Sequence, residues 1–156
     1  MALFYTINEI AHVDQPLVTV FDHEFLRIAA FEAPDQVLTR ALRAYDQTPL
    51  IHTQRPLESL QEMPVQFVGT DFQRRVWACV SEIPRGEVRT YTEIAAEIGK
   101  PQAARAVGNA LNTNPVAYFV PCHRVVHKQQ TPEGYRWGAK TKQQLLHSER
   151  ILRAQR

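Results

Sequence analysis

The sequence has only two cysteines, Cys79 and Cys122, in 156 residues, which excludes the disulfide frameworks of small secreted domains. No stretch approaches the roughly 18 apolar residues of a membrane span. Residues 1–9 have neither the basic stretch nor the long apolar run of a signal peptide. Repeats and low-complexity tracts are also absent. We therefore expect a cytoplasmic protein with reduced thiols and a core of its own.

Charge is distributed unevenly along the chain. Residues 1–69 contain four Lys/Arg and nine Asp/Glu, whereas residues 70–156 contain fourteen and seven, giving net charges of −5 and +7. A basic half suggests contact with a polyanion such as nucleic acid. Attraction between two packed lobes is the simpler alternative, and charge alone does not separate the two explanations.

Short apolar runs bounded by turn residues predict three strands in the first third, over residues 3–7, 16–21 and 25–31. Apolar residues at helical spacing predict a helix over residues 34–45, with Pro34 in its first turn. Residues 48–64 contain three prolines, and we interpret them as a linker or an extended connection.

The basic half predicts helices over residues 71–83, 91–98, 101–112 and 140–152. The second and third of these, joined by a short turn containing glycine, have the layout of a helix-turn-helix. The third is built largely of alanine and glycine, with Arg105 as its one long cation. Such a helix approaches another surface closely, either a helix of the same core or a nucleic-acid backbone.

The most distinctive segment is Pro121-Cys122-His123-Arg124-Val125, which has apolar residues on both sides. We expect it to be extended and buried, so that the thiol and the imidazole are held rigidly. Only a thiolate attacks, but neighbouring side chains of a strand point to opposite faces. A bridging water would therefore carry the proton from Cys122 to His123. Glu149 is the best candidate for a carboxylate that orients the imidazole.

Two structural alternatives compete with this interpretation. A buried cysteine is usually a small core residue, as we expect for Cys79. A Cys-His pair can also be half of a zinc site, but no other cysteine lies at ligand spacing. The pattern alone leaves both a catalytic and a structural Cys122 open.

The segment from Pro121 to Val125 resembles the active-site signature of the O6-alkylguanine-DNA alkyltransferases, also called methylated-DNA–protein-cysteine methyltransferases. The resemblance covers about residues 69–150 without an evident gap. The other matching segments are Gly69-Thr70-Asp71-Phe72-Gln73, Val76-Trp77, Ile83-Pro84, Gly86, Tyr91, Ala104-Arg105-Ala106-Val107-Gly108, Asn114-Pro115, Gly134-Tyr135-Arg136-Trp137-Gly138, Lys142, Leu145-Leu146 and Glu149.

The resemblance implies an α/β N-terminal domain, residues 1–66, and a mostly α C-terminal domain, residues 67–156, with a winged-helix-like helix-turn-helix. It implies repair of O6-alkylguanine, and more weakly O4-alkylthymine, in double-stranded DNA by a single-use transfer. No cofactor or metal is expected, because no cysteine precedes Cys79 where some relatives carry zinc. We expect a monomer without a membrane partner, associated with the nucleoid if the source is bacterial.

The resemblance also implies roles for individual residues. Cys122 would take the alkyl group after deprotonation by His123 with a water and Glu149. Tyr91 would help rotate the nucleotide and meet the base edge, and Asn114 would tie the recognition helix to the active-site segment.

Further residues would contact the DNA or the substrate. Arg105 would fill the place of the extruded base. The other implied DNA contacts are Tyr91, Ala104, Asn109 and Asn112. The implied substrate pocket comprises Val125, Tyr135, Arg136 and Lys142.

The loop of residues 128–133 departs from the family pattern, which leaves the width of the alkyl pocket and its tolerance of bulky adducts open. The main alternative function is a non-transferring protein that binds alkylated DNA and recruits other repair factors, but such relatives lack the cysteine. A cysteine hydrolase would leave the helix-turn-helix unexplained. A transcription regulator would leave the buried Cys-His pair unexplained.

Overall fold

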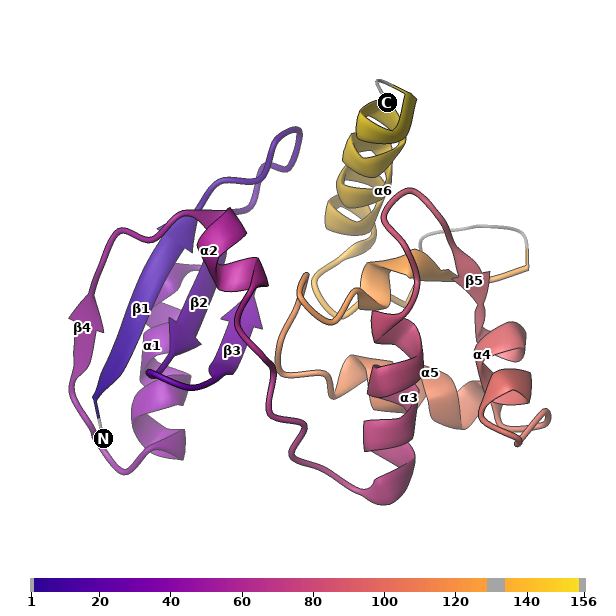
Figure 1. Ribbon diagram of the computed structural model, residues 1–156, viewed down its shortest axis with the longest axis horizontal. Coiled ribbons are helices and arrows are strands. Elements are labelled where there is room, and N and C mark those ends of the chain that lie inside the picture. Colours follow the sequence, from indigo (N-terminus) through magenta and orange to yellow (C-terminus); the bar gives the residue numbers. More distant parts are fainter. Residues whose placement is uncertain (1, 129–133, 155–156) are drawn as a thin grey trace. The chain divides into compact units, whose positions relative to one another are not determined.

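The computed structural model describes residues 2–128 and 134–154, with side chains up to residue 150 (Figure 1). The chain forms two compact units: Met1–Gln66 with Pro115–Phe119, and Phe67–Asn114 with Val120–Arg156. Residues 115–119 thus belong to the first unit, whereas the predicted domain boundary after residue 66 assigns them to the second domain. Val116 makes an isolated parallel bridge with Ala29. Ala29 N donates to Pro115 O at 3.0 Å, and Ala117 N donates to Ala29 O at 2.8 Å.

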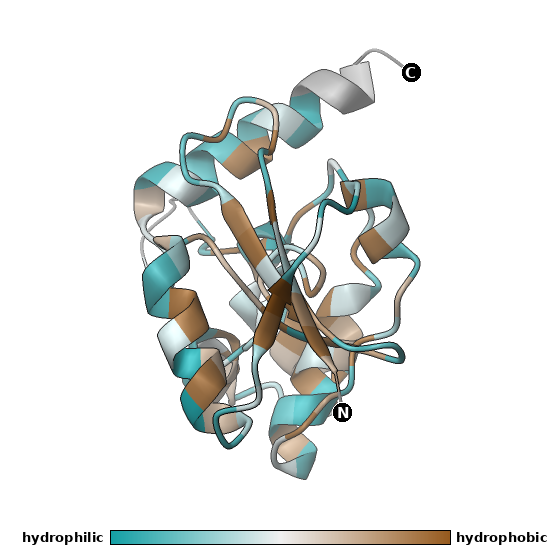
Figure 2. Ribbon diagram, turned by 90° about the vertical axis from the view of Figure 1, so that its left-hand side faces the viewer, coloured by the Kyte–Doolittle hydropathy of each residue, from teal (hydrophilic) through white to brown (hydrophobic). Residues whose placement is uncertain are grey.

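The first unit contains a four-stranded sheet in the order β3-β2-β1-β4. Its strands are β1 (Leu3–Asn8), β2 (Leu17–Phe21), β3 (Leu26–Ala30) and β4 (Leu50–His52). β1 pairs antiparallel with β2 and parallel with β4, and β2 pairs antiparallel with β3. Figure 2 shows apolar residues along these strands and alternating apolar and hydrophilic residues along the helices. Every residue of β2 is buried, so this strand lies at the centre of the unit's core.

Two helices complete the first unit: α1 (Pro34–Ala44) and α2 (Leu57–Gln61). Pro34 opens α1 as predicted, because its fixed φ suits a first turn that needs no N–H donor. A tight turn follows β2. Asp22 closes it by accepting the N–H groups of Glu24 and Phe25 through Oδ1, both at 2.8 Å.

The interpretation of residues 48–64 as a linker or an extended connection was wrong, because this segment contains the paired strand β4 and the helix α2. Thr53 N donates to Tyr5 O at 3.0 Å and extends the parallel pairing with β1. The prolines do not interrupt these elements: Pro49 precedes β4, and Pro56 is the N-cap of α2. A strand of three residues is too short to show an alternation of apolar and polar residues in the sequence. β4 forms because it pairs with β1.

The second unit is mostly helical. Its elements are α3 (Asp71–Ser81), β5 (Arg89–Thr90), α4 (Tyr91–Glu97), α5 (Ala104–Asn112), the 3-10 helix η1 (Cys122–Arg124), β6 (Val125–Val126) and α6 (Ala139–Ala154). Helices α4 and α5 form the expected helix-turn-helix, and β5 pairs parallel with β6. The predicted fold class, an α/β unit followed by a helical one, is confirmed. No helix in the described part of the chain has the length and apolar character needed to cross a membrane.

The starts of α3 and α4 follow the sequence closely. Thr70 and Thr90 each form a capping box, in which the hydroxyl accepts an N–H of the first turn and a Gln or Glu side chain reaches back. The third helix begins later than predicted, at Ala104 instead of Pro101. Pro101 lies in a turn that Ala103 N closes by donating to Lys100 O at 2.9 Å. Trp77 on α3 donates through Nε1 to Ala110 O on α5 at 2.8 Å and joins these two helices.

The capping box of α3 is expected to stabilise the second unit measurably. Thr70→Ala removes one acceptor from the exposed helix start and should lower the free energy of unfolding by about 1 kcal/mol. Urea denaturation followed by circular dichroism should show a lower midpoint with an unchanged slope. Thr39→Ala is a suitable control, because this hydroxyl only bonds back to Asp35 O within α1. Equal midpoints for wild type and Thr70→Ala would contradict the stabilising role of the cap.

Candidate active site and nucleic-acid interface

Cys122 lies at the start of a tight turn and not in an extended strand as predicted. Pro121 has φ −81° and ψ 63°, and η1 then runs from Cys122 to Arg124. Cys122 N donates to Val120 O at 2.8 Å, and Arg124 N donates to Pro121 O at 2.9 Å. The alternation of side chains expected for a strand therefore does not apply to Cys122 and His123. Regular pairing begins only at β6.

The thiol of Cys122 is buried, with 4% of the residue exposed. The side-chain amide of Asn114 donates to Sγ at 3.3 Å and to Val120 O at 3.1 Å. Burial raises the pKa of Cys122, while hydrogen bonding to Asn114 and Tyr135 and the charge of Lys142 oppose this rise. The thiol is therefore protonated at neutral pH and requires a base before it can attack.

His123, the residue after Cys122, belongs to a buried charged cluster with Arg124 and Glu149. His123 Nε2 lies 2.8 Å from Glu149 Oε1. Arg124 donates to both carboxylate oxygens, through Nη2 to Oε1 at 2.8 Å and through Nε to Oε2 at 3.1 Å. Its Nη1 donates to Ile83 O at 2.8 Å, which fixes the guanidinium on a second element.

The cluster determines the charge states of its members. Burial alone would raise the pKa of Glu149, but His123 and Arg124 together lower it to about 2. Burial lowers the pKa of His123, although Glu149 opposes this shift. A neutral imidazole beside an ionised carboxylate donates Nε2–H to it, which assigns the basic lone pair to Nδ1. His123 therefore has the charge state of a general base at neutral pH.

Lys142 is fully buried behind this region. Its Nζ donates to Val125 O at 2.6 Å. The same ammonium lies 5.8 Å from the ring centroid of Tyr91 and 5.9 Å from that of Tyr135. These contacts compensate part of the cost of a buried charge. Lys142 thus supports the backbone immediately after the 3-10 turn.

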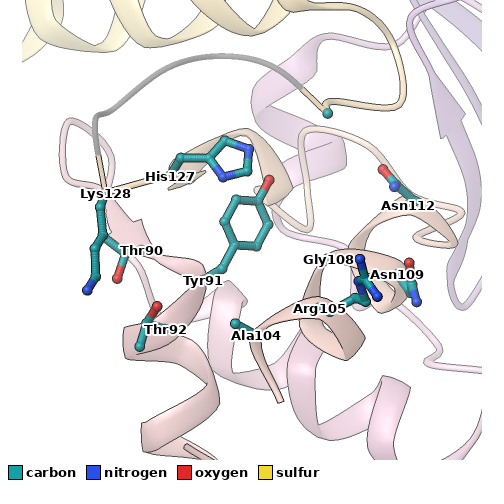
Figure 3. Close-up of a pocket in the computed structure, with 11 residues that line it drawn as sticks. Thr90, Tyr91, Thr92, Ala104, Arg105, Gly108, Asn109, Asn112, His127 and Lys128 are labelled. Atoms are coloured by element: carbon teal, nitrogen blue, oxygen red, sulfur yellow. The ribbon is translucent and has the colours of Figure 1, made fainter. Parts of the chain in front are cut away.

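A pocket of about 480 Å³ opens between the starts of α4 and α5 and the end of β6 (Figure 3). All five residues predicted to contact DNA line it: Tyr91, Ala104, Arg105, Asn109 and Asn112. Arg105 is exposed, and Gly108 lies beside Tyr91, where a Cβ would make an ordinary van der Waals contact with the ring at 3.8 Å. The pocket therefore has an aromatic side chain on one side and a helix with small residues on the other.

The residues predicted to form the substrate pocket do not line this hollow. Val125, Tyr135 and Lys142 are buried around Cys122. Arg136 is exposed, and its Nη1 donates to Asn114 O at 2.9 Å. The structure thus brings the predicted residues together in two sets: a buried set around Cys122 and an open set along α5.

Sequence reasoning missed several residues of both sets. Arg124 was noted only as part of the signature, although a cation next to a buried histidine is a natural partner for a buried carboxylate. Thr90, Thr92 and His127 line the pocket as well. These residues come together at the pocket because β5 pairs with β6, and the two strands are too short to give a recognisable sequence pattern. Lys128 also lines the pocket and begins the loop of residues 128–133 that was expected at the alkyl pocket; residues 129–133 lie outside the described part of the chain. Among the described residues, no group of three His, Cys, Asp or Glu side chains gathers where a metal could bind.

Comparisons with known proteins agree with this arrangement. Residues 71–151 match the family model of the 6-O-methylguanine DNA methyltransferase, DNA binding domain. Over 104 residues the chain is 45% identical to a methylated-DNA–protein-cysteine methyltransferase of Saccharomyces cerevisiae, covering 66% of this chain and 55% of the relative. A relative of the same name from Methanosarcina barkeri is 54% identical over 81 residues, which cover 52% of this chain and 51% of the relative. The chain thus spans about half the length of the curated relatives that it matches.

A solved structure extends the similarity to both units. It is the crystal structure of the Mycobacterium tuberculosis protein OGT in complex with DNA, with a TM-score of 0.66 and 32% identity. The match covers 95% of this chain and 93% of that one. The chain therefore belongs to the 6-O-methylguanine DNA methyltransferase family.

The depressed pKa of Glu149 predicts a specific loss of stability in acid. Its pKa falls from an ordinary value of 4.5 to about 2 in the folded protein. The stability that ionised Glu149 contributes is therefore fully present above about pH 4.5 and is lost as the pH falls through about 2. The contribution is roughly 3 kcal/mol. Urea denaturation at several acidic pH values should show a steeper loss for wild type than for Glu149→Gln.

Glu82→Gln serves as the control, because Glu82 is an exposed carboxylate at the end of α3 in the same unit. This variant should keep the steep acid dependence of wild type. The same slope in Glu149→Gln and in wild type would show that another carboxylate causes the acid sensitivity.

Proposed function

We propose that this chain repairs DNA by transferring the alkyl group of O6-alkylguanine, and of O4-alkylthymine, to Cys122. The observation that carries the proposal is the buried Cys122 thiol, whose surroundings raise its pKa and keep it protonated. The next residue, His123, has a neutral imidazole that contacts the ionised carboxylate of Glu149. This combination provides a nucleophile, a base and a group that orients the base.

The reaction follows from these charge states. The Cys122 proton passes through a water to His123, and Glu149 stabilises the resulting imidazolium. The thiolate then attacks the alkyl carbon, a C–S bond forms and the bond between that carbon and O6 breaks. The base leaves with the electron pair and takes up a proton. The thioether product is not hydrolysed, so each molecule acts once and no cofactor takes part.

The proposed DNA contact is the open pocket along α5. The presence of DNA in the M. tuberculosis complex supports this assignment for a related protein. Tyr91 would meet the extruded base, while Asn114, fully buried between α5 and Cys122, would keep the helix and the thiol in register. The domain of residues 67–156 would then carry both DNA binding and transfer. A monomeric state and a cytoplasmic location remain predictions.

The proposal is tested by incubating the protein with duplex DNA containing O6-methylguanine and measuring its intact mass. We expect one added methyl group per molecule, located on Cys122 by peptide mapping, even with excess DNA. Cys122→Ser should bind the same duplex without accepting the methyl group, because affinity comes from phosphate contacts and chemistry from the thiol. Cys79→Ser is the matched control and should react like wild type.

Other outcomes identify the alternatives. Sustained release of repaired DNA would support a hydrolase, and binding by the wild type without any transfer would support a lesion-recognition protein. A methyl group found on Cys79 in Cys122→Ala would contradict the assignment of the acceptor. Burial and the nearby Glu97 raise the pKa of Cys79 to about 11, which makes it a poor nucleophile.

Arg105 is expected to fill the vacated position in the base stack. Base extrusion costs a few kcal/mol, and a guanidinium stacks on neighbouring bases while bonding the orphaned partner. Arg105→Ala should slow repair of duplex DNA by roughly ten- to a hundredfold. Its reaction with free O6-methylguanine base, which needs no extrusion, should change much less.

Single-turnover rates on both substrates test this expectation. Arg74→Ala is the control, because Arg74 is an exposed cation on α3 paired with Asp71, away from the pocket lining. Equal losses for Arg105→Ala on duplex and free base would assign Arg105 to the fold or to the pocket and contradict a role in extrusion.

A further inference from the structure

His127 lies at the rim of the pocket because of the pairing between two short strands. β5 and β6 run parallel, with Arg89 opposite Val125 and Thr90 opposite Val126. Tyr91 follows Thr90 and His127 follows Val126, so the pairing places Tyr91 and His127 side by side. The two ring centroids are 4.9 Å apart, with an angle of 41° between the ring planes. Figure 3 shows these two rings on one side of the pocket and Arg105 on the other.

The charged residues that line the pocket beside His127 in the described part of the chain are cations. Lys128 follows it at the rim, and Arg105 lines the opposite side on α5. Behind Tyr91 lies the buried ammonium of Lys142, 5.8 Å from the ring centroid. On β5 the charged residue is Arg89, whose guanidinium pairs with Glu87 at 3.5 Å. Among the described residues that line the pocket, none is Asp or Glu.

This setting makes the charge of His127 depend on what occupies the rim. The charged residues among the described pocket lining are cations, so none of them stabilises an imidazolium by its charge. A phosphate placed at the rim reverses this balance, because an opposite charge within a few ångströms stabilises the imidazolium. His127 is exposed, so its ring nitrogens are accessible to such an anion.

We propose that His127 binds a phosphate of the DNA backbone as the imidazolium, so that DNA binding is coupled to the uptake of a proton. The proposal rests on the proposed function, because DNA is its ligand. It adds a DNA contact that titrates, beside permanent cations such as Arg105 and Lys128. In the simpler alternative, His127 only packs its ring against Tyr91, and its charge has no effect on binding.

The coupling has a defined sign. Since the complex binds one more proton than the free protein, affinity for DNA decreases as the pH rises through the range in which histidine loses its charge. The dissociation constant should increase by up to about tenfold between about pH 5.5 and about pH 8.5. The slope of the logarithm of the binding constant against the logarithm of salt concentration should also be steeper by about 0.9 at the acidic end, as expected for one additional phosphate contact.

The test uses the full chain with Cys122→Ser, so that no transfer occurs, and a fluorescent duplex containing O6-methylguanine. Dissociation constants are measured by anisotropy over this pH range at two salt concentrations. His127→Gln should bind with little pH dependence, at the weaker affinity of the parent at high pH. His127→Lys carries a permanent charge and should bind with little pH dependence at the tighter affinity of the parent at low pH. His147→Gln, at an exposed histidine of α6 outside the pocket lining, should keep the dependence of the parent.

The outcomes separate this inference from the proposed function. Binding that is independent of pH in the parent, or an unchanged pH dependence in His127→Gln, overturns the role of His127 and leaves the proposed repair activity standing. An equal loss of affinity at every pH in His127→Gln also overturns it, because that result assigns His127 to ring packing. Absence of DNA binding at every pH overturns both.

Discussion

The ionised state of Glu149 is the constraint on which the rest of the candidate active site depends. A buried carboxylate normally becomes protonated, because burial penalises its charged form. Here Arg124 donates to both of its oxygens, and His123 lies 2.8 Å from one of them. Protein side chains therefore balance the charge of the Glu149 carboxylate. If Glu149 were neutral, His123 would lose its orienting acceptor and its stabilising charge.

The same interaction connects separate parts of the second unit. Arg124 belongs to the 3-10 turn, Glu149 to α6, and Ile83 O follows α3. One guanidinium thus fixes the turn that carries the thiol against two helices. Breaking a buried pair by removing one partner leaves an uncompensated charge, so the arrangement is maintained as a unit. A thiol that must react with little freedom of movement benefits from such a rigid base.

Asn114 gives the second connection, between the site of chemistry and the surface along α5. It is fully buried just after α5, and its side-chain amide donates to both Sγ of Cys122 and Val120 O. Tyr91, half-buried at the start of α4, lines the pocket, and burial together with the nearby Cys122 raises its pKa. The buried set around Cys122 and the open pocket are therefore adjacent but chemically distinct, one buried and the other exposed and basic.

The amino-acid sequence by itself determined the local features. The capping threonines Thr70 and Thr90, the opening proline of α1 and the helix-turn-helix could be predicted, because each depends on residues within a few positions of one another. The signature at Cys122 was also apparent, and with it the pairing of His123 with a carboxylate. Apart from the pairing of His123 with Glu149, which joins residues 26 positions apart, these features required no knowledge of which distant segments meet.

The tertiary structure decided the rest. β4 exists because it pairs with β1, some 47 residues away, and β5 and β6 are too short to be recognised before they pair. The turn at Cys122, the pairing of Arg124 with Glu149 and the position of His127 beside Tyr91 all depend on contacts between segments far apart in the sequence. Local preferences are weak at such positions, because short elements bury little surface of their own and gain their stability only from the partner segment.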